Sequence, residues 1–306
     1  MRVGIVIMAV PQPEVASTAR WAEEVGFDYV ASGAHLFFNV PTPNAFITLA
    51  AAAGATQRIR LLSTLTLLPL YPPALAAKLI ASIDDVSGGR FDLGVGVGGE
   101  FPMEFDAVGV PVKERGRRTD ESLDLITTFL SGRPVTGQGW WGSAENLKLR
   151  PPAVQQPHPP IWLGGRKEAA FRRAGRFANH WLPYLYTPEQ MSDSLAKVNQ
   201  YAADFGRADR VDGAIFCWGA VDRDGAVARR AAIDTVSTTY KQDFEPLASR
   251  YLVFGTPQQV IDRLLEYRDA GAQTVIFSSP PGEQFRTNAT LLAEEVLPAL
   301  REGTHD

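Results

Sequence analysis

The sequence is poor in cysteine and histidine, and this scarcity excludes several kinds of site. Its 306 residues include one cysteine, Cys217, and four histidines. A single cysteine excludes an internal disulfide, and the apolar stretch around it predicts a buried thiol rather than a nucleophile. The ligand spacings of zinc and carboxylate-metal sites are missing, as are a Walker loop and a Ser-His-Asp order. We therefore expect no metal site.

Long apolar runs and an excess of positive charge are also missing. No run reaches the ~18 uncharged apolar residues of a membrane-spanning helix. The N-terminal residues MRVGIVIMAV lack the apolar core and cleavage site of a signal peptide. The chain has 30 basic and 34 acidic residues, a net charge of −4 and a pI near 5.7, which argues against nucleic acid or an anionic membrane as the main partner. We expect a soluble cytoplasmic protein.

What the sequence does contain is a repeated unit of one strand-like and one helix-like segment. The predicted strands are Val3–Ala9, Phe27–Ala31, Ile59–Leu70, Phe91–Val97, Pro160–Leu163, Asn179–Pro183, Gly213–Val221 and Gln273–Ser278. Eight such units in a chain of this length predict an α/β protein, a single (β/α)8 TIM barrel over residues 1–306. An open doubly wound sheet is the alternative, but the chain lacks a GxGxxG helix start with an acidic residue ~20 positions later.

A βαβ unit between Arg58 and Glu100 is the clearest local pattern. Its two apolar runs flank a helix that begins at a double proline and ends at a double glycine, so the two strands are parallel. Glycines occupy positions 94, 96, 98 and 99 in and after the second run. Glycine inside a strand marks close approach by a ligand or by another backbone segment, which makes Gly98 and Gly99 candidate cofactor-binding residues.

The residues LTLLPLYPPALAAKLIASIDDVSGGRFDLGVGVG resemble the signature of the luciferase-like flavin and deazaflavin oxidoreductases. PPIWLGG and RRAGRFANHWLP agree with the same family, and the resemblance covers nearly the whole chain. It implies a TIM barrel that binds a three-ring cofactor, coenzyme F420 or FMN. Such a cofactor is needed because hydride transfer and oxygen activation are beyond side chains alone.

Residues 131–159 interrupt the strand–helix rhythm after the fourth helix, predicted over Arg115–Leu130. Pro, Gly and Gln are frequent there, and Trp140 and Trp141 are adjacent. We expect an insertion with little regular structure, because connections this long are usually functional or disordered. The resemblance implies that it covers one side of the barrel mouth, and a surface loop without a function is the alternative.

Barrel enzymes carry their active sites at the carboxyl ends of the strands. His35 follows the second predicted strand and is a candidate acid or base. In deazaflavin-dependent relatives the matching histidine follows an aspartate, whereas Ala34 precedes it here, which leaves a structural histidine as the alternative. Glu100 follows the glycines of the fourth strand, close to where some relatives place a catalytic glutamate. Glu104 also fits the family pattern, and we expect it to be structural.

Candidate cofactor-binding residues lie in the same region of the predicted barrel. The resemblance places a non-proline cis peptide at Ser63-Thr64, behind the cofactor rings; an ordinary strand is the alternative. Arg115 begins a helix, where its charge and the free backbone N–H groups suit a phosphate; a solvated basic run paired with nearby carboxylates is the alternative. Gly164 and Gly165 end the fifth strand and form a small loop that accepts an anion or contacts a ring edge, with Arg166 and Lys167 nearby. Tyr184 follows the sixth strand.

The resemblance and His35 together predict a coenzyme F420-dependent oxidoreductase that passes hydride to or from a small organic substrate. A monooxygenase using reduced FMN and O₂ is the first alternative, and a non-catalytic flavin-binding barrel is the second. The loop 37–43, the insertion and the loop 184–186 are expected to set the substrate. The helix from Asn44 to Ala53 is apolar nearly all round, so we also expect a homodimer.

Overall fold

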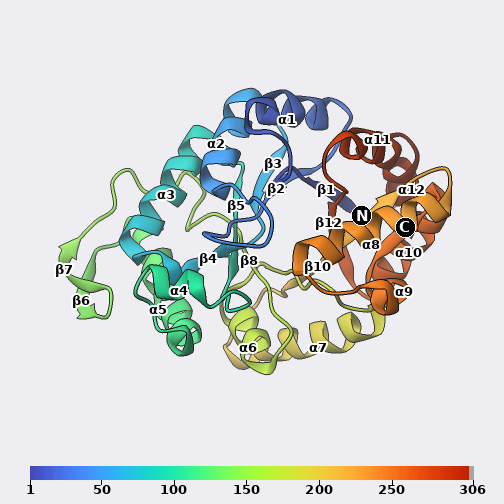
Figure 1. The fold of residues 1–306 in the computed structure, drawn as a ribbon. Coiled ribbons are helices and arrows are strands. Elements are labelled where there is room, and N and C mark those ends of the chain that lie inside the picture. Colours follow the sequence, from blue (N-terminus) through green and yellow to red (C-terminus); the bar gives the residue numbers. More distant parts are fainter. Residues whose placement is uncertain (303–306) are drawn as a thin grey trace.

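Eight parallel strands close into a barrel, and helices surround it on the outside (Figure 1). The structure is a computed structural model that describes residues 1–302; His305 lies outside them. Neighbouring strands around the barrel follow the order β1, β2, β3, β5, β8, β9, β10 and β12, and β12 pairs with β1 to close the ring. These strands are Arg2–Val6, Tyr29–Ser32, Arg60–Ser63, Phe91–Gly96, Ile161–Leu163, His180–Trp181, Asp212–Val221 and Ala272–Ser278. The predicted (β/α)8 barrel is confirmed.

The strands are apolar because both of their faces are buried. One set of side chains fills the barrel interior, including Tyr29, Leu62, Trp162 and Ile276. The opposite faces pack against the surrounding helices in the largest core cluster. Cys217 belongs to that cluster, and burial raises the pKa of its thiol to about 12, as expected for a buried cysteine without a reactive thiolate.

The outer helices begin and end at the signals that the sequence carries. They are α1 (Val15–Glu24), α2 (Ala45–Ala55), α3 (Pro73–Val86), α5 (Arg115–Leu130), α6 (Glu168–Phe177), α7 (Pro188–Asp204), α8 (Gly225–Tyr240), α10 (Pro257–Asp269), α11 (Glu283–Leu291) and α12 (Leu297–Glu302), with the shorter α4 (Met103–Ala107) and α9 (Ala248–Tyr251). Asn44 accepts hydrogen bonds from the first turn of α2, and Thr256 forms a capping box with Gln259 at the start of α10. Within residues 1–302, no helix is both long and apolar enough to cross a membrane.

The third predicted strand is wrong in its extent. Instead of one strand over Ile59–Leu70, the chain forms β3, a two-residue strand β4 (Thr66–Leu67) and a short 3-10 turn. The non-proline cis peptide lies between Thr64 and Leu65, one bond after the predicted one. At the end of β3 the backbone bulges toward β5. It can do so because residue 94 of β5 is glycine: a Cβ there would lie 1.8 Å from the carbonyl oxygen of Ser63. Glycine at 94 therefore serves close backbone approach rather than a ligand.

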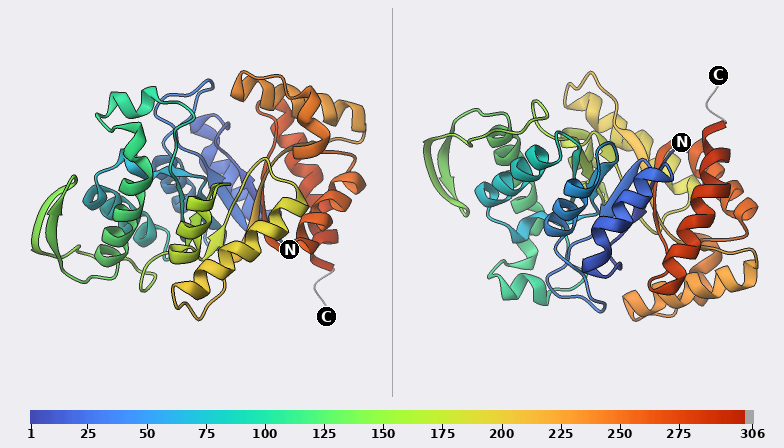
Figure 2. Two further views of the ribbon diagram at one scale, coloured as in Figure 1. Left: turned by 90° about the horizontal axis from the view of Figure 1, so that it is seen from below. Right: turned by 90° about the horizontal axis from the view of Figure 1, so that it is seen from above.

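The insertion also differs from the prediction, because it contains an antiparallel hairpin of β6 (Val135–Gly139) and β7 (Gly142–Leu147). The hairpin projects from the outer side of the barrel beside α3 and α5 (Figures 1 and 2). Trp140, in its turn, lies under the guanidinium of Arg118 of α5, 4.4 Å from the ring centroid. Trp140 thus contacts an outer helix, and neither tryptophan is among the residues that line the barrel mouth, so the insertion does not cover the mouth as predicted.

Candidate active site

A cavity of about 500 Å³ opens at the carboxyl ends of the barrel strands. Segments after β1, β2, β3, β5, β8 and β9 contribute its walls, together with β10 itself, the start of α5 and the end of α8. This is the end of the barrel where TIM-barrel enzymes hold their active sites. The predicted site residues at this surface are His35, Thr64, Gly98, Gly99, Glu100, Arg115, Gly164, Gly165, Arg166 and Tyr184.

Ser63 is the exception among the predicted cofactor-binding residues. Its side chain is fully buried between two strands, where its hydroxyl donates to the Gly94 carbonyl oxygen at 3.1 Å and accepts from the Gly94 N–H at 2.9 Å. The hydroxyl thus joins β3 to β5 and lies in the wall rather than on the cavity surface. Thr64, the next residue, lines the cavity instead. Its hydroxyl oxygen is buried and has no hydrogen-bond partner within the described part of the chain.

His35 is paired with Glu104, a residue that the sequence interpretation had taken for a structural one. Nδ1 of His35 lies 3.0 Å from Oε2 and 3.2 Å from Oε1 of Glu104. Glu104 lies on the short helix α4, and its side chain is completely buried, whereas that of His35 is 22% exposed. The carboxylate expected from an aspartate at position 34 therefore comes from Glu104 instead.

The same carboxylate fixes the backbone on both sides of the contact. The N–H groups of Leu36 and Phe37 donate to Oε1 of Glu104 at 2.6 and 3.1 Å. Glu104 thus satisfies three donors or potential donors of the loop after β2 and holds the imidazole in one place. With Nδ1 directed at Glu104, Nε2 is the ring nitrogen left for a ligand in the cavity.

Glu100 lies on the exposed rim and accepts a hydrogen bond from the Tyr184 hydroxyl. Desolvation raises the pKa of the Glu100 carboxyl, while the nearby charges of His35 and Arg166 act in the opposite direction. Tyr184 is engaged on its other side as well, because the Arg166 guanidinium lies 4.7 Å from its ring centroid. The contacts connect the loops after β5, β8 and β9 across the rim.

The cations of the cavity come from two adjacent segments, the start of α5 and the loop after β8. Arg115 donates from Nη1 to the carbonyl oxygen of Val112 at 2.8 Å and packs against Gly99, where a Cβ would lie 2.7 Å from its Nε. Arg166 and Lys167 are exposed beside Gly165, whose φ of +112° favours glycine. Arg115, Arg166 and Lys167 all line the cavity, and such basic side chains are well suited to a phosphate.

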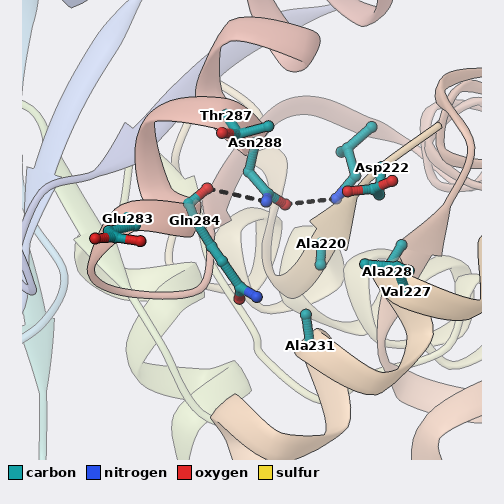
Figure 3. Close-up of a pocket in the computed structure, with 10 residues that line it drawn as sticks. Ala220, Asp222, Val227, Ala228, Ala231, Glu283, Gln284, Thr287 and Asn288 are labelled. Carbon is teal, nitrogen blue, oxygen red and sulfur yellow. Dashed lines mark hydrogen bonds between the residues drawn. The ribbon is translucent and has the colours of Figure 1, made fainter. Parts of the chain in front are cut away.

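A second, smaller hollow of about 210 Å³ lies between the end of β10 and the first turns of α8 and α11 (Figure 3). Its buried amide, Asn288, is paired within the protein: it donates to the Gln284 carbonyl oxygen at 3.0 Å and accepts from the Val221 N–H at 2.6 Å. This hollow therefore offers a ligand far less than the barrel mouth does.

A family model described as luciferase-like monooxygenase matches residues 1–274 of the chain. The chain belongs to this family. Luciferase-like relatives include the 5,10-methylenetetrahydromethanopterin reductase of Methanopyrus kandleri, 25% identical over 98% of both chains. The F420-dependent glucose-6-phosphate dehydrogenase of Microbacterium testaceum is 28% identical over 92% of this chain and 91% of its own. Uncharacterised proteins of Mycobacterium bovis and Mycobacterium tuberculosis are 31% identical over 59% of this chain, and the match spans 62% of their own length.

Solved structures place the chain in the same fold. A monooxygenase from Streptomyces bottropensis superposes with a TM-score of 0.86 at 24% identity, covering 98% of this chain and all of that one. The coenzyme F420-dependent tetrahydromethanopterin reductase of Methanopyrus kandleri superposes with a TM-score of 0.84 at 23% identity, over 97% of this chain and 98% of its own. A monooxygenase and a coenzyme F420-dependent reductase thus share this architecture.

Proposed function

We propose that the protein is a coenzyme F420-dependent oxidoreductase that moves a hydride to or from a small organic substrate. The observation that carries the proposal is the His35–Glu104 pair, which presents one fixed imidazole nitrogen to a cavity of about 500 Å³. The F420-dependent glucose-6-phosphate dehydrogenase and the coenzyme F420-dependent tetrahydromethanopterin reductase among its relatives support the choice of cofactor. A monooxygenase that uses reduced FMN is the competing function.

The residues present fit a three-ring cofactor with a phosphate-bearing tail. Thr64 and Leu65 form a wall on which rings can lie, and the Thr64 hydroxyl has no partner within the described residues. Gly98 and Gly99, both with positive φ, follow the neighbouring strand β5 and add no side chains to the cavity. Arg115, Arg166 and Lys167 would hold the phosphate, because guanidinium and ammonium groups form charge-assisted hydrogen bonds with phosphate oxygens.

The bound deazaflavin would supply the hydride donor or acceptor. His35 would hold or release the proton that accompanies hydride transfer, through Nε2, at the substrate oxygen. Glu104 orients the ring by accepting from Nδ1 and stabilises the imidazole when it carries a proton. The rim contacts of Glu100, Tyr184 and Arg166 would restrict water at the cavity entrance.

Titration of the purified protein with oxidised coenzyme F420 and, separately, with FMN tests the proposal. We expect F420 to quench fluorescence with a dissociation constant at least tenfold lower than that of FMN. Binding of FMN tenfold tighter than F420 would assign the protein to the monooxygenase alternative. Tight F420 binding without reduction or oxidation of the cofactor by a panel of alcohols and carbonyl compounds would favour a non-catalytic barrel.

A further inference from the structure

We propose that the substrate is a neutral alcohol or carbonyl compound carrying an apolar ring, bound against an aromatic wall beside His35; this inference rests on the proposed function. The wall consists of Phe38, Tyr184, Trp218 and Tyr240, all of which line the cavity. These residues are called the aromatic wall below.

The aromatic wall is joined to the imidazole through Phe38, and the other rings follow from it one after another. The His35 ring stacks on Phe38 with centroids 4.2 Å apart and planes 21° apart. Phe38 meets Tyr240 edge to face at 6.1 Å, and Tyr240 meets Trp218 edge to face at 6.0 Å. Tyr184 stacks on Tyr240 at 6.5 Å. A substrate whose oxygen reaches Nε2 of His35 therefore has aromatic surface around its carbon skeleton.

Charge beside His35 disfavours an anionic substrate. The charged group in contact with the imidazole is the buried carboxylate of Glu104, and Glu100 interacts with the same ring electrostatically. A substrate carboxylate or phosphate placed there would face two groups of its own sign. The cations Arg115, Arg166 and Lys167 are those to which the proposed function assigns the cofactor phosphate, and Arg166 also lies over the ring of Tyr184.

The fold holds the wall in place, so little conformational entropy is lost when a ligand binds. Tyr240 is the last residue of α8, and Phe244 packs behind it at a centroid distance of 5.8 Å. Asn39 donates to the Thr239 carbonyl oxygen at 3.2 Å, which fastens the loop after β2 to the end of α8. Phe38 and Tyr240, 202 positions apart in the sequence, are thereby kept together, and rigid aromatic anchors favour affinity.

The proposed step is balanced with the cofactor as the two-electron partner. In the oxidative direction the C–H bond at the carbinol carbon breaks and its hydride passes to the oxidised deazaflavin. The O–H proton passes to Nε2 of His35, and the carbon–oxygen double bond forms. The reductive direction reverses each transfer. In both directions only the carbinol carbon and its oxygen react, and the apolar ring of the substrate remains unchanged.

The test compares two probes that differ only at one substituent: 1-phenylethanol, which is neutral, and mandelate, in which a carboxylate replaces the methyl group. Calorimetric or ligand-observed NMR titration of the full chain is done with and without F420. We expect 1-phenylethanol to bind at least tenfold more tightly than mandelate. Equal binding, or tighter binding of mandelate, overturns the inference even if F420 binds. Absence of F420 binding overturns the proposed function. In that case the ratio of the two probe affinities in cofactor-free protein still tests whether the aromatic wall prefers a neutral ligand.

Variants test whether the preference for the neutral probe comes from the aromatic wall. Phe38→Ala should weaken 1-phenylethanol binding about fivefold or more and change mandelate binding little. Phe205→Ala, at the 40% exposed end of α7 and outside the cavity, should change neither. If Phe38→Ala does not fold, Phe38→Leu, which keeps apolar bulk, should show a smaller loss in the same direction. A Phe38 variant that folds and binds 1-phenylethanol like the wild type contradicts the proposal.

Discussion

His35 and Glu104 are 69 positions apart in the sequence, and the fold brings Nδ1 of the imidazole within 3.0 Å of a fully buried carboxylate oxygen. The pair combines an exposed reactive edge with a buried anchor. Because Glu104 also accepts from two backbone N–H groups of the same loop, it sets both the position of His35 and the shape of the loop that carries it. Catalysis and loop structure are therefore coupled at this carboxylate.

Substitutions of the pair should separate these two roles. His35→Ala should lower kcat by ~10²–10⁴-fold, the usual contribution of general acid–base catalysis, and leave cofactor affinity nearly intact. Glu104→Gln should lower kcat while the fold persists, since its amide oxygen can still accept from the loop. Glu104→Ala should also destabilise the fold by about 1–3 kcal/mol for each buried donor left unpaired. Steady-state kinetics and urea unfolding measure the two effects; a Glu104→Ala variant as stable as the wild type would contradict the anchoring role.

The sequence was sufficient for the barrel because each strand is an apolar run buried on both faces, a pattern visible without partners. It was insufficient where the structure depends on what lies opposite. The bulge after Ser63 requires the missing side chain of Gly94 on the neighbouring strand. The hairpin in the insertion escaped prediction because its strands are mostly exposed and polar and so show no apolar alternation.

The site shows the same division. Residues at strand ends, such as His35, Arg166 and Tyr184, were predictable because the barrel places its site there. Glu104 was not assigned because its partner is distant in the sequence. The available signal was an acidic residue between Met103 and Phe105 in an apolar segment, since a buried carboxylate needs hydrogen-bond partners. The wall residues Trp218 and Tyr240 depend on how α8 ends above the barrel, which no local pattern specifies.

Arg115 should contribute to cofactor affinity rather than to chemistry. If it holds the phosphate, Arg115→Ala removes a charge-assisted contact worth about 1.5–3 kcal/mol, and the dissociation constant for F420 should rise about tenfold to hundredfold. Fluorescence titration measures the change, with His35→Ala as the control that keeps normal affinity. If Arg115→Ala binds F420 like the wild type, the phosphate lies at Gly165 and Arg166 instead.

His180 should make the protein less stable in mild acid. Its buried ring lies over Trp162, and Nδ1 makes no hydrogen bond within residues 1–302, although Oδ2 of Asp212 lies 3.7 Å away. Burial together with Arg2 and Arg60 lowers the pKa of His180 from 6.5 to about 4. Between these values the unfolded chain binds the proton and the folded protein does not, so stability falls as the pH falls from 6.5 toward 4. At about 1.4 kcal/mol per pH unit the loss is roughly 3 kcal/mol.

His180→Gln removes the titrating ring and should flatten this dependence, even if the variant is less stable at neutral pH. Free energies of unfolding from urea denaturation at pH 7 and pH 5 give the comparison. The difference between the two pH values should be smaller for the variant than for the wild type. An equal difference would show that another group causes the acid sensitivity.

The exposed face of α2 should pair two copies of the chain. Ile47, Ala51 and Gly54 are all exposed and recur at positions i, i+4 and i+7, so they form one stripe along the helix, and Ile47 is 68% exposed. The opposite face of α2 is covered by the barrel, and burial of the stripe against a second copy would remove its apolar surface from water. Light scattering at micromolar concentration should give about twice the chain mass of 33.3 kDa.

Ile47→Glu should reduce the mass toward that of one chain, because a buried carboxylate without a partner is unfavourable at an interface. Val227→Glu, an equivalent change at an exposed site on α8, should leave the dimer intact. A wild-type mass near 33.3 kDa would contradict this prediction, because the chain would then be a monomer with the apolar stripe of α2 in contact with water.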